Sequence, residues 1–287
     1  MGIAIPQVIT SDRASGNQVI AGSLTFQRAH ENYLTRAVSS EGDRQKWTFS
    51  CWIKRDDLPA ASRQIWGQVA TNHSSDPANG RWQLYYDANE NLNTHTYNQS
   101  ELVTSAKFRD TGWYHVVQAL DTTLGSSEAS SRLRLYINGV EQTGTRTNPT
   151  EDARLGANSV GNIVIGTADN AKSTYYIDAK MAQIYFIDGQ QLGPEYFGFT
   201  DPLTGIWKPK KYVNTTASHG DAAGVVGFGT NGFYLPLDGS APAGQDQSGQ
   251  GNDFSLNGFS GSVALDNPNV SGARPILNTT QGGTQAG

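Results

Sequence analysis

The sequence predicts an all-β fold, an antiparallel jelly-roll sandwich with an extended N-terminal arm and a C-terminal extension. Apolar and polar residues alternate along short segments such as Leu133-Arg134-Leu135-Tyr136-Ile137, as in a strand with one buried face. Asn138-Gly139 follows this segment and tolerates the positive φ angles of a tight reversal. The chain has 32 glycines and only 37% hydrophobic residues, which fits many turns around a two-layer core.

The order of elements follows from the same alternation. An extended arm is predicted for residues 1–20, and the sandwich is predicted for residues 21–200. In segment 46–55, Trp47 and Phe49 share one face while Trp52 lies on the other, so we expect the second face to be partly covered or to line a groove. Pro194 favours a helical turn within 193–199. The expected strands are 23–27, 33–38, 46–55, 64–70, 81–87, 91–97, 101–108, 113–121, 132–138, 162–165 and 179–187.

Residues 201–287 form the predicted C-terminal extension. Segment 200–230 is expected to be irregular, and 233–237 is one more apolar strand, with Pro236 placing it at an edge or a strand end.

Charge and cysteine content exclude several classes. A net charge of -5 argues against nucleic-acid binding, which needs a basic patch to neutralise phosphates. The single cysteine, Cys51, forms no internal disulfide and is expected to be a small buried side chain in a protein that folds in a reducing compartment. No apolar run is long enough to span a bilayer, and the start lacks the order of a signal peptide.

Three groups of segments carry a family resemblance. They are Trp47-Thr48-Phe49-Ser50-Cys51-Trp52-Ile53-Lys54, Trp113-Tyr114-His115-Val116-Val117 with Tyr136-Ile137-Asn138-Gly139, and Ile165-Gly166 with the segment 176–184. In order and spacing they resemble the laminin G-like, concanavalin A-like jelly roll over roughly residues 20–200. The resemblance implies a lectin-like sandwich.

A narrower resemblance concerns segments 185–190, 200–212, 232–235 and 248–254, which are similar to tail-fibre and other virion proteins of bacteriophages. It implies a component of an assembled particle, made in the host cytoplasm and located in the virion. The implied partners are other virion proteins, copies of the chain itself in a homo-oligomer, and a host cell-surface glycan. Neither nucleic acid nor membrane insertion is expected.

The tail resembles a family segment that normally comes first. Residues 233–238 and 246–253 are similar to the opening strand and loop of a laminin G-like domain. About fifty residues cannot bury a second core unaided. We therefore hypothesise that 233–237 closes the sandwich as a permuted first strand, in this subunit or in a neighbour.

Two kinds of binding site are considered. Trp52, Trp66, Trp82 and Tyr97 are candidates for a glycan platform, with Asn72, Asn93 and Asn98 nearby; the alternative is that each tryptophan belongs to the core. Asp169, Asn170 and Asp178 are candidate Ca²⁺ ligands, the only cofactor considered, by resemblance to the family's closing segment. Their alternative is turn capping, and Ala179 stands where the family has glycine.

Catalysis is not expected. Retaining glycosidases place two carboxylates ~5 Å apart, and the glutamates here are scattered. His115 is expected to be a hydrogen-bonded structural histidine. The sequence therefore predicts a non-enzymatic virion structural protein, a fibre or a capsid decoration, that mediates assembly or surface contacts. A glycan-binding receptor adhesin of the tail is the alternative, and a polysaccharide depolymerase is less favoured.

Overall fold

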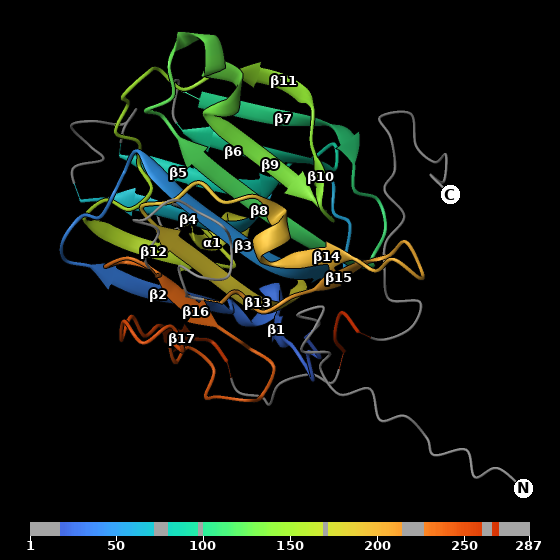
Figure 1. Cartoon of the computed structure of the whole chain (residues 1–287). Coiled ribbons are helices and arrows are strands. Elements are labelled where there is room, and N and C mark those ends of the chain that lie inside the picture. The colour runs from blue at the N-terminus through green and yellow to red at the C-terminus, as the bar shows by residue number, and fades with distance from the viewer. Residues whose placement is uncertain are drawn as a thin grey trace, which may run out of the picture.

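Two antiparallel sheets stack face to face in the computed structural model, with a small third sheet on the front of the sandwich (Figure 1). The structure describes residues 18–71, 80–96, 100–168, 172–213, 227–259 and 266–269. The predicted all-β sandwich is confirmed. No helix in these ranges is long and apolar enough to cross a membrane.

The first sheet has seven strands, in the order β1-β13-β3-β8-β9-β10, with β16 also paired to β13. The second sheet has eight, in the order β11-β7-β6-β5-β4-β12-β2-β17, and β14 pairs with β15. The bounds in chain order are β1 Leu24–Phe26, β2 Tyr33–Val38, β3 Lys46–Arg55, β4 Arg63–Ala70, β5 Arg81–Tyr86, β6 Asn91–Thr96, β7 Ser100–Lys107, β8 Trp113–Asp121, β9 Leu133–Ile137, β10 Val140–Glu141, β11 Gly144–Thr147, β12 Gly161–Ile165, α1 Lys172–Tyr175, β13 Ala179–Asp188, β14 Gly198–Thr200, β15 Trp207–Pro209, β16 Phe233–Leu235 and β17 Ser255–Asn257. Short 3₁₀ helices lie at Arg28–His30, Ser126–Ser131 and Pro194–Tyr196.

Every predicted strand is present, within two residues at each end. The shorter strands β10, β11, β14, β15 and β17 were not predicted. β11 has no apolar side chain, and β15 lies in a region expected to be irregular, so neither shows the alternation that marks a buried face.

The core lies between the two large sheets. Trp47, Phe49, Cys51 and Ile53 of β3 all point into it and are fully buried, as the alternation predicted. The indole of Trp47 meets that of Trp66 from the opposite sheet edge to face, with ring centroids 5.5 Å apart. Aromatic pairs of this kind add to the stabilisation from buried area.

The segment that was predicted to be a permuted strand lies in the seven-stranded sheet of its own chain. β16 pairs antiparallel with β13, placing Phe233 opposite Phe186, while β1 pairs with the earlier part of the same edge of β13 (Figure 1). Between these two partners, Gln183 adopts a left-handed conformation with φ of 52° and marks a bulge. Its Oε1 accepts hydrogen bonds from the Tyr234 hydroxyl at 2.6 Å and from Gln18 Nε2 at 2.8 Å.

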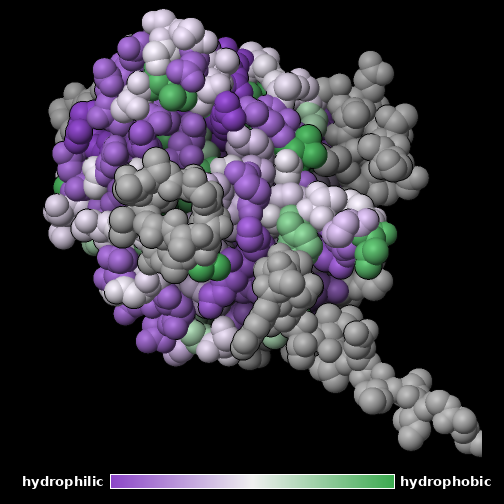
Figure 2. Space-filling model, viewed as in Figure 1, coloured by the Kyte–Doolittle hydropathy of each residue, from purple (hydrophilic) through white to green (hydrophobic). Residues whose placement is uncertain are grey.

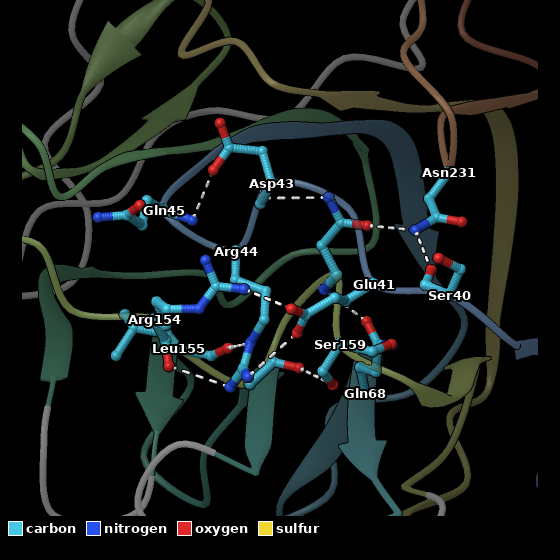
Figure 3. Close-up of polar contacts among 12 residues, drawn as sticks. Ser40, Glu41, Asp43, Arg44, Gln45, Gln68, Arg154, Leu155, Ser159 and Asn231 are labelled. Atoms are coloured by element: carbon cyan, nitrogen blue, oxygen red, sulfur yellow. Dashed lines mark hydrogen bonds and ion pairs between the residues drawn. The ribbon is translucent and has the colours of Figure 1, made fainter.

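A polar cluster ties the extension to one end of the sandwich (Figure 3). Asn231 Nδ2 donates to Ser40 O at 2.9 Å, and the Asn231 backbone N–H donates to Asp188 Oδ2 at 3.0 Å. In the same cluster Arg44 Nε donates to Leu155 O at 2.7 Å. Buried polar groups of this kind are stabilising only when they are paired, so the cluster fixes where the extension docks.

The outer face of the seven-stranded sheet is covered by the chain itself, as expected for the face that carries Trp52. Val117, Tyr185 and Ile187 contact Phe197 and Tyr212, which follow β13 in sequence. The β14–β15 hairpin lies across the sheet and brings Trp207 onto His115, with ring centroids 5.9 Å apart.

Candidate functional site

The outer face of the eight-stranded sheet carries a group of polar and aromatic side chains. Trp66, Leu84, Leu92 and Leu102 point into the core, so their neighbours along each strand point outward. We call the outward-pointing group the polar strip. Its members are Gln64 of β4, Gln83 and Tyr85 of β5, Asn93 and His95 of β6, and Glu101 of β7.

Cross-strand register arranges the polar strip in two rows. Gln83 lies opposite His95, which lies opposite Glu101. In the second row, Tyr85 lies between Gln64 and Asn93. Because neighbouring strands are about 4.8 Å apart, each row presents one side chain at about that interval across the sheet.

The amides of the polar strip are largely enclosed. Gln64, Gln83 and Asn93 are 2%, 6% and 5% exposed, although they lie on the side of the sheet away from the core. Gln83 Nε2 donates to Gln64 Oε1 at 2.7 Å. Asn93 Oδ1 is buried and has no hydrogen-bond partner within the described part of the chain. A buried acceptor without a partner carries a free-energy penalty.

The ionisable groups of the strip are tuned by burial. Burial raises the pKa of Tyr85 to about 12, with Glu101 and Asp87 adding to the rise, so its hydroxyl stays a donor at neutral pH. Burial also lowers the pKa of His95, against the opposing effect of Glu101. His95 is therefore neutral at pH 7 and offers one donor and one acceptor. The strip is suited to binding neutral hydroxyl groups.

The predicted tryptophan platform is wrong for the three tryptophans that the structure describes. Trp66 and Trp82 point into the core, where both indole N–H groups donate to Gln118 Oε1, at 3.1 and 3.2 Å. Trp52 lies on the other sheet, 2% exposed, against His115. The structure shows these tryptophans buried, which is the alternative that the sequence left open. Tyr97, Asn72 and Asn98 lie outside the described residues.

Of the predicted calcium ligands, Asp178 is engaged elsewhere. Its carboxylate accepts a hydrogen bond from the Arg28 backbone N–H at 2.7 Å and pairs with the Arg28 guanidinium at 3.1 Å. This is the turn-capping alternative combined with an ion pair. Asp169 and Asn170 lie outside the described residues. In the described ranges, no three His, Cys, Asp or Glu side chains come together as a metal site requires.

His115 is the structural histidine that the sequence predicted. It is 1% exposed, its Nδ1 accepts a hydrogen bond from Trp207 Nε1 at 3.0 Å, and its Nε2 lies 2.9 Å from Ser50 Oγ. Because an indole N–H only donates, the imidazole proton must be on Nε2 and points at Ser50. Burial lowers the pKa of His115 to about 3, so the ring stays neutral.

Sequence reasoning named Asn93 only as a polar residue near the proposed glycan platform and did not identify the other members of the strip. The residue types at the outward-facing positions of segments 81–86 and 91–96 could have indicated them. Glutamine, asparagine, tyrosine and histidine occupy these positions, and asparagine is otherwise depleted in strands.

Comparison with known proteins adds the following findings. The chain resembles a heptameric SAP-like pentraxin from Limulus polyphemus, with 14% identity, a TM-score of 0.41, and coverage of 62% of this chain and 81% of that one. A putative carbohydrate binding protein from Bacteroides ovatus is 13% identical, with a TM-score of 0.49 and coverage of 87% of this chain and 63% of that chain. The NanB sialidase from Streptococcus pneumoniae is 13% identical, with a TM-score of 0.41 and coverage of 63% of this chain and 29% of that chain. The similarity to these structures is confined to the fold.

No curated protein sequence is similar enough to this chain to count as a relative. The model of one protein family does match, over residues 28–192, which is more than half of the chain. The matched region holds β2 to β13 and therefore most of both large sheets. The chain belongs to the concanavalin A-like lectin/glucanases superfamily.

Proposed function

We propose that this protein is a non-enzymatic adhesive component of a phage virion that binds a surface glycan through the polar strip. The observation that supports glycan binding is the pair of enclosed rows on the outer face of the eight-stranded sheet. There, Gln83, Asn93 and His95 offer neutral donors and acceptors beside the ring of Tyr85. Lectin sites combine such polar groups with an aromatic face.

The absence of catalysis is part of the proposal. Hydrolysis of a glycosidic bond with retention needs two carboxylates about 5 Å apart. Glu101 is the one carboxylate in the two rows of the strip, and its neighbours His95 and Val103 supply no second acid. Binding without bond cleavage is the chemistry that these side chains support.

The virion context is supported by the sequence resemblance of segments 185–190 and 200–212 to phage tail-fibre and other virion proteins. Location in the particle, assembly with other virion proteins and self-association are parts of the same proposal. Electron microscopy of the particle with an antibody against the sandwich tests it. Labelling of tails or capsids is expected, and particles without any label would contradict it.

Glycan binding is tested by screening the full chain on an array of surface oligosaccharides and measuring affinity for the best binder by calorimetry. Gln83→Ala and His95→Ala should each weaken binding about three- to tenfold, because each removes one or two hydrogen bonds. Gln27→Ala and His30→Ala change the same residue types at exposed positions outside the strip and are the matched controls. Equal affinities for all four variants would contradict the proposed site.

A second candidate function is a protein contact in the assembled particle, favoured by the tip of the β14–β15 hairpin. Leu203 there is 94% exposed, Ile206 is also exposed, and the hairpin tip shows apolar colour in Figure 2. Asp201 makes the tip rigid, since its Oδ1 accepts the Leu203 N–H at 2.9 Å. Leu203→Ser should weaken incorporation into particles while glycan affinity is unchanged.

A further inference from the structure

The C-terminal extension forms a pocket against the outer side of the eight-stranded sheet, separate from the polar strip. Its volume is about 490 Å³, within the ~300–1,000 Å³ that is usual for small-ligand sites. One wall belongs to the sheet and the other to the loop before β17. The lining residues are Thr35, Arg36, Ala37, Ser39, Asn162, Gly251, Asn252, Asp253 and Ser255.

The loop wall is held firmly in place. Asp253 Oδ1 accepts a hydrogen bond from the Asp246 backbone N–H at 2.8 Å, and Asn252 Nδ2 donates to Gly232 O at 2.7 Å. β17 then pairs with β2, with Ser255 opposite Thr35. The pocket is therefore formed before any ligand arrives, which lowers the entropic cost of binding.

Arg36 of the sheet wall lies opposite the core residue Ile163, so its side chain points to the inner side of the sheet and anchors the wall from behind. Arg36 donates from one terminal nitrogen to Asn231 O at 3.1 Å and from the other to Asn231 Oδ1 at 3.2 Å. This pair of bonds ties β2 to the C-terminal extension and so fixes the sheet wall. The acidic groups that interact with Arg36 are Asp246 and Asp188.

Donors and acceptors are mixed in the pocket. The Asp253 carboxylate accepts, and Asn162 and Ser255 can both donate and accept. A sugar hydroxyl also donates and accepts, so this lining matches a polyhydroxylated ligand. Because Asp246 and Asp188 already offset the charge of Arg36, the Asp253 carboxylate at the surface would repel an acidic sugar. The chemistry selects a neutral sugar.

The pocket is connected to the polar strip by one row of outward-facing positions. Ala37 lies opposite Asn162, Asn162 opposite Val69, and Val69 opposite Arg81. Arg81 is two residues from Gln83 on the same face of β5. The row crosses three strand spacings, or about 14 Å, the length of a few sugar units.

We infer that the pocket is a second subsite for a neutral sugar unit of the same oligosaccharide chain that binds the polar strip. This inference rests on the proposed glycan function and specifies its ligand as an extended neutral chain. It also gives the C-terminal extension a part in binding, in addition to closing the sandwich. Longer chains should bind more tightly than short ones, because they reach both subsites.

The test is calorimetry with the full chain and with neutral hexose oligosaccharides of two and six units, in the linkage that binds best on the array. Asn162→Ala and Asp253→Asn should weaken binding of the hexasaccharide about three- to tenfold and leave the disaccharide unchanged. Asp253→Asn keeps the Oδ1 that holds the loop. Ala37→Tyr, which fills the pocket, should remove the advantage of the longer chain. Glu128→Gln, at an exposed position outside the pocket, is the control.

The outcomes separate the two proposals. Unchanged hexasaccharide affinity in all three pocket variants, with loss in Gln83→Ala, overturns the second subsite and leaves the polar strip standing. Loss in the pocket variants alone, with Gln83→Ala unaffected, overturns the strip. Absence of any neutral oligosaccharide binding by the wild-type chain overturns both. Circular dichroism spectra identical to wild type establish that each variant is folded.

Discussion

At the scale of single residues, the chemistry of a side chain depends on what faces it across the core. Trp66 and Trp82 are large aromatics on strands, equally suited by sequence to a binding platform or to a core. Gln118 from the opposite sheet decides between these roles, because its Oε1 accepts the N–H of both indoles. A glutamine inside this β-sandwich core serves as the acceptor for two buried donors.

Replacing this shared acceptor should destabilise the fold. Gln118→Leu leaves two buried indole N–H groups without a partner and should lower the free energy of unfolding by about 1–3 kcal/mol. Urea denaturation followed by tryptophan fluorescence measures the change. Gln27→Leu, at an exposed glutamine, is the matched control and should change stability by less than about 0.5 kcal/mol. Equal midpoints for the two variants would show that the double acceptor is unimportant.

The buried His115 predicts a pH dependence of stability. Burial lowers its pKa from 6.5 to about 3, so between these values the unfolded chain binds a proton that the folded chain does not. Stability contributed by the neutral ring is complete above pH 6.5 and is lost as the pH falls toward 3. Wild type should lose ~1.4 kcal/mol per pH unit more than His115→Gln in this interval. Parallel curves of unfolding free energy against pH would refute this.

At the scale of elements, close approach of the β14–β15 hairpin to the seven-stranded sheet depends on glycine. The indole of Trp207 lies so close to Gly198 and Gly139 that a Cβ at either would come within 2.4–2.5 Å of a ring atom. Gly139 also has a φ of 81° in the β9–β10 turn. The two glycines therefore position the tryptophan that covers His115.

Adding a methyl group at this contact should disturb the hairpin. Gly198→Ala forces the rigid indole of Trp207 to shift and should cost about 1–3 kcal/mol of stability. Gly125→Ala is the matched control, since no atom lies within 4 Å of its Cβ and its φ of -64° suits alanine. That change should be neutral or should stabilise by up to ~1 kcal/mol. Thermal denaturation measures the stability of both variants. An equal loss of stability in both would contradict the role of Trp207.

At the scale of the whole molecule, the sandwich is complete only with the C-terminal extension. Phe233, Leu235, Leu237 and Phe254 belong to the main core cluster together with residues of both sheets. The extension also supplies β17, which pairs with β2 and covers part of that strand. The family match ends at residue 192, so the matched region alone does not include these core side chains.

A chain ending at Val213 should fail to fold cooperatively. It loses the four core side chains named above, and a large-to-small change at a single core position already costs about 2–5 kcal/mol. Their sum is comparable to the whole stability of a domain, ~5–15 kcal/mol. Loss of a sigmoidal urea transition and of the near-ultraviolet circular dichroism spectrum is expected. A chain ending at Asn269 keeps every described segment and is the control; a native-like transition in the shorter chain would contradict the argument.

Local sequence by itself determined the fold class and most strands. In β3 the alternation of apolar and polar residues defined the strand bounds, because this pattern depends on neighbours along the chain. Short strands such as β11 lacked that signal. The apolar segment 233–237 could be read as a strand, but its partner was left open between this subunit and a neighbour.

Tertiary structure alone decided which polar residues meet. Gln83, His95 and Glu101 are scattered over three strands, and only the register of β5, β6 and β7 brings them into one row. The pocket likewise joins β2 to a loop more than two hundred residues later in the chain. A sequence specifies the period of each strand, but cross-strand neighbours depend on the pairing that minimises the free energy of the whole chain.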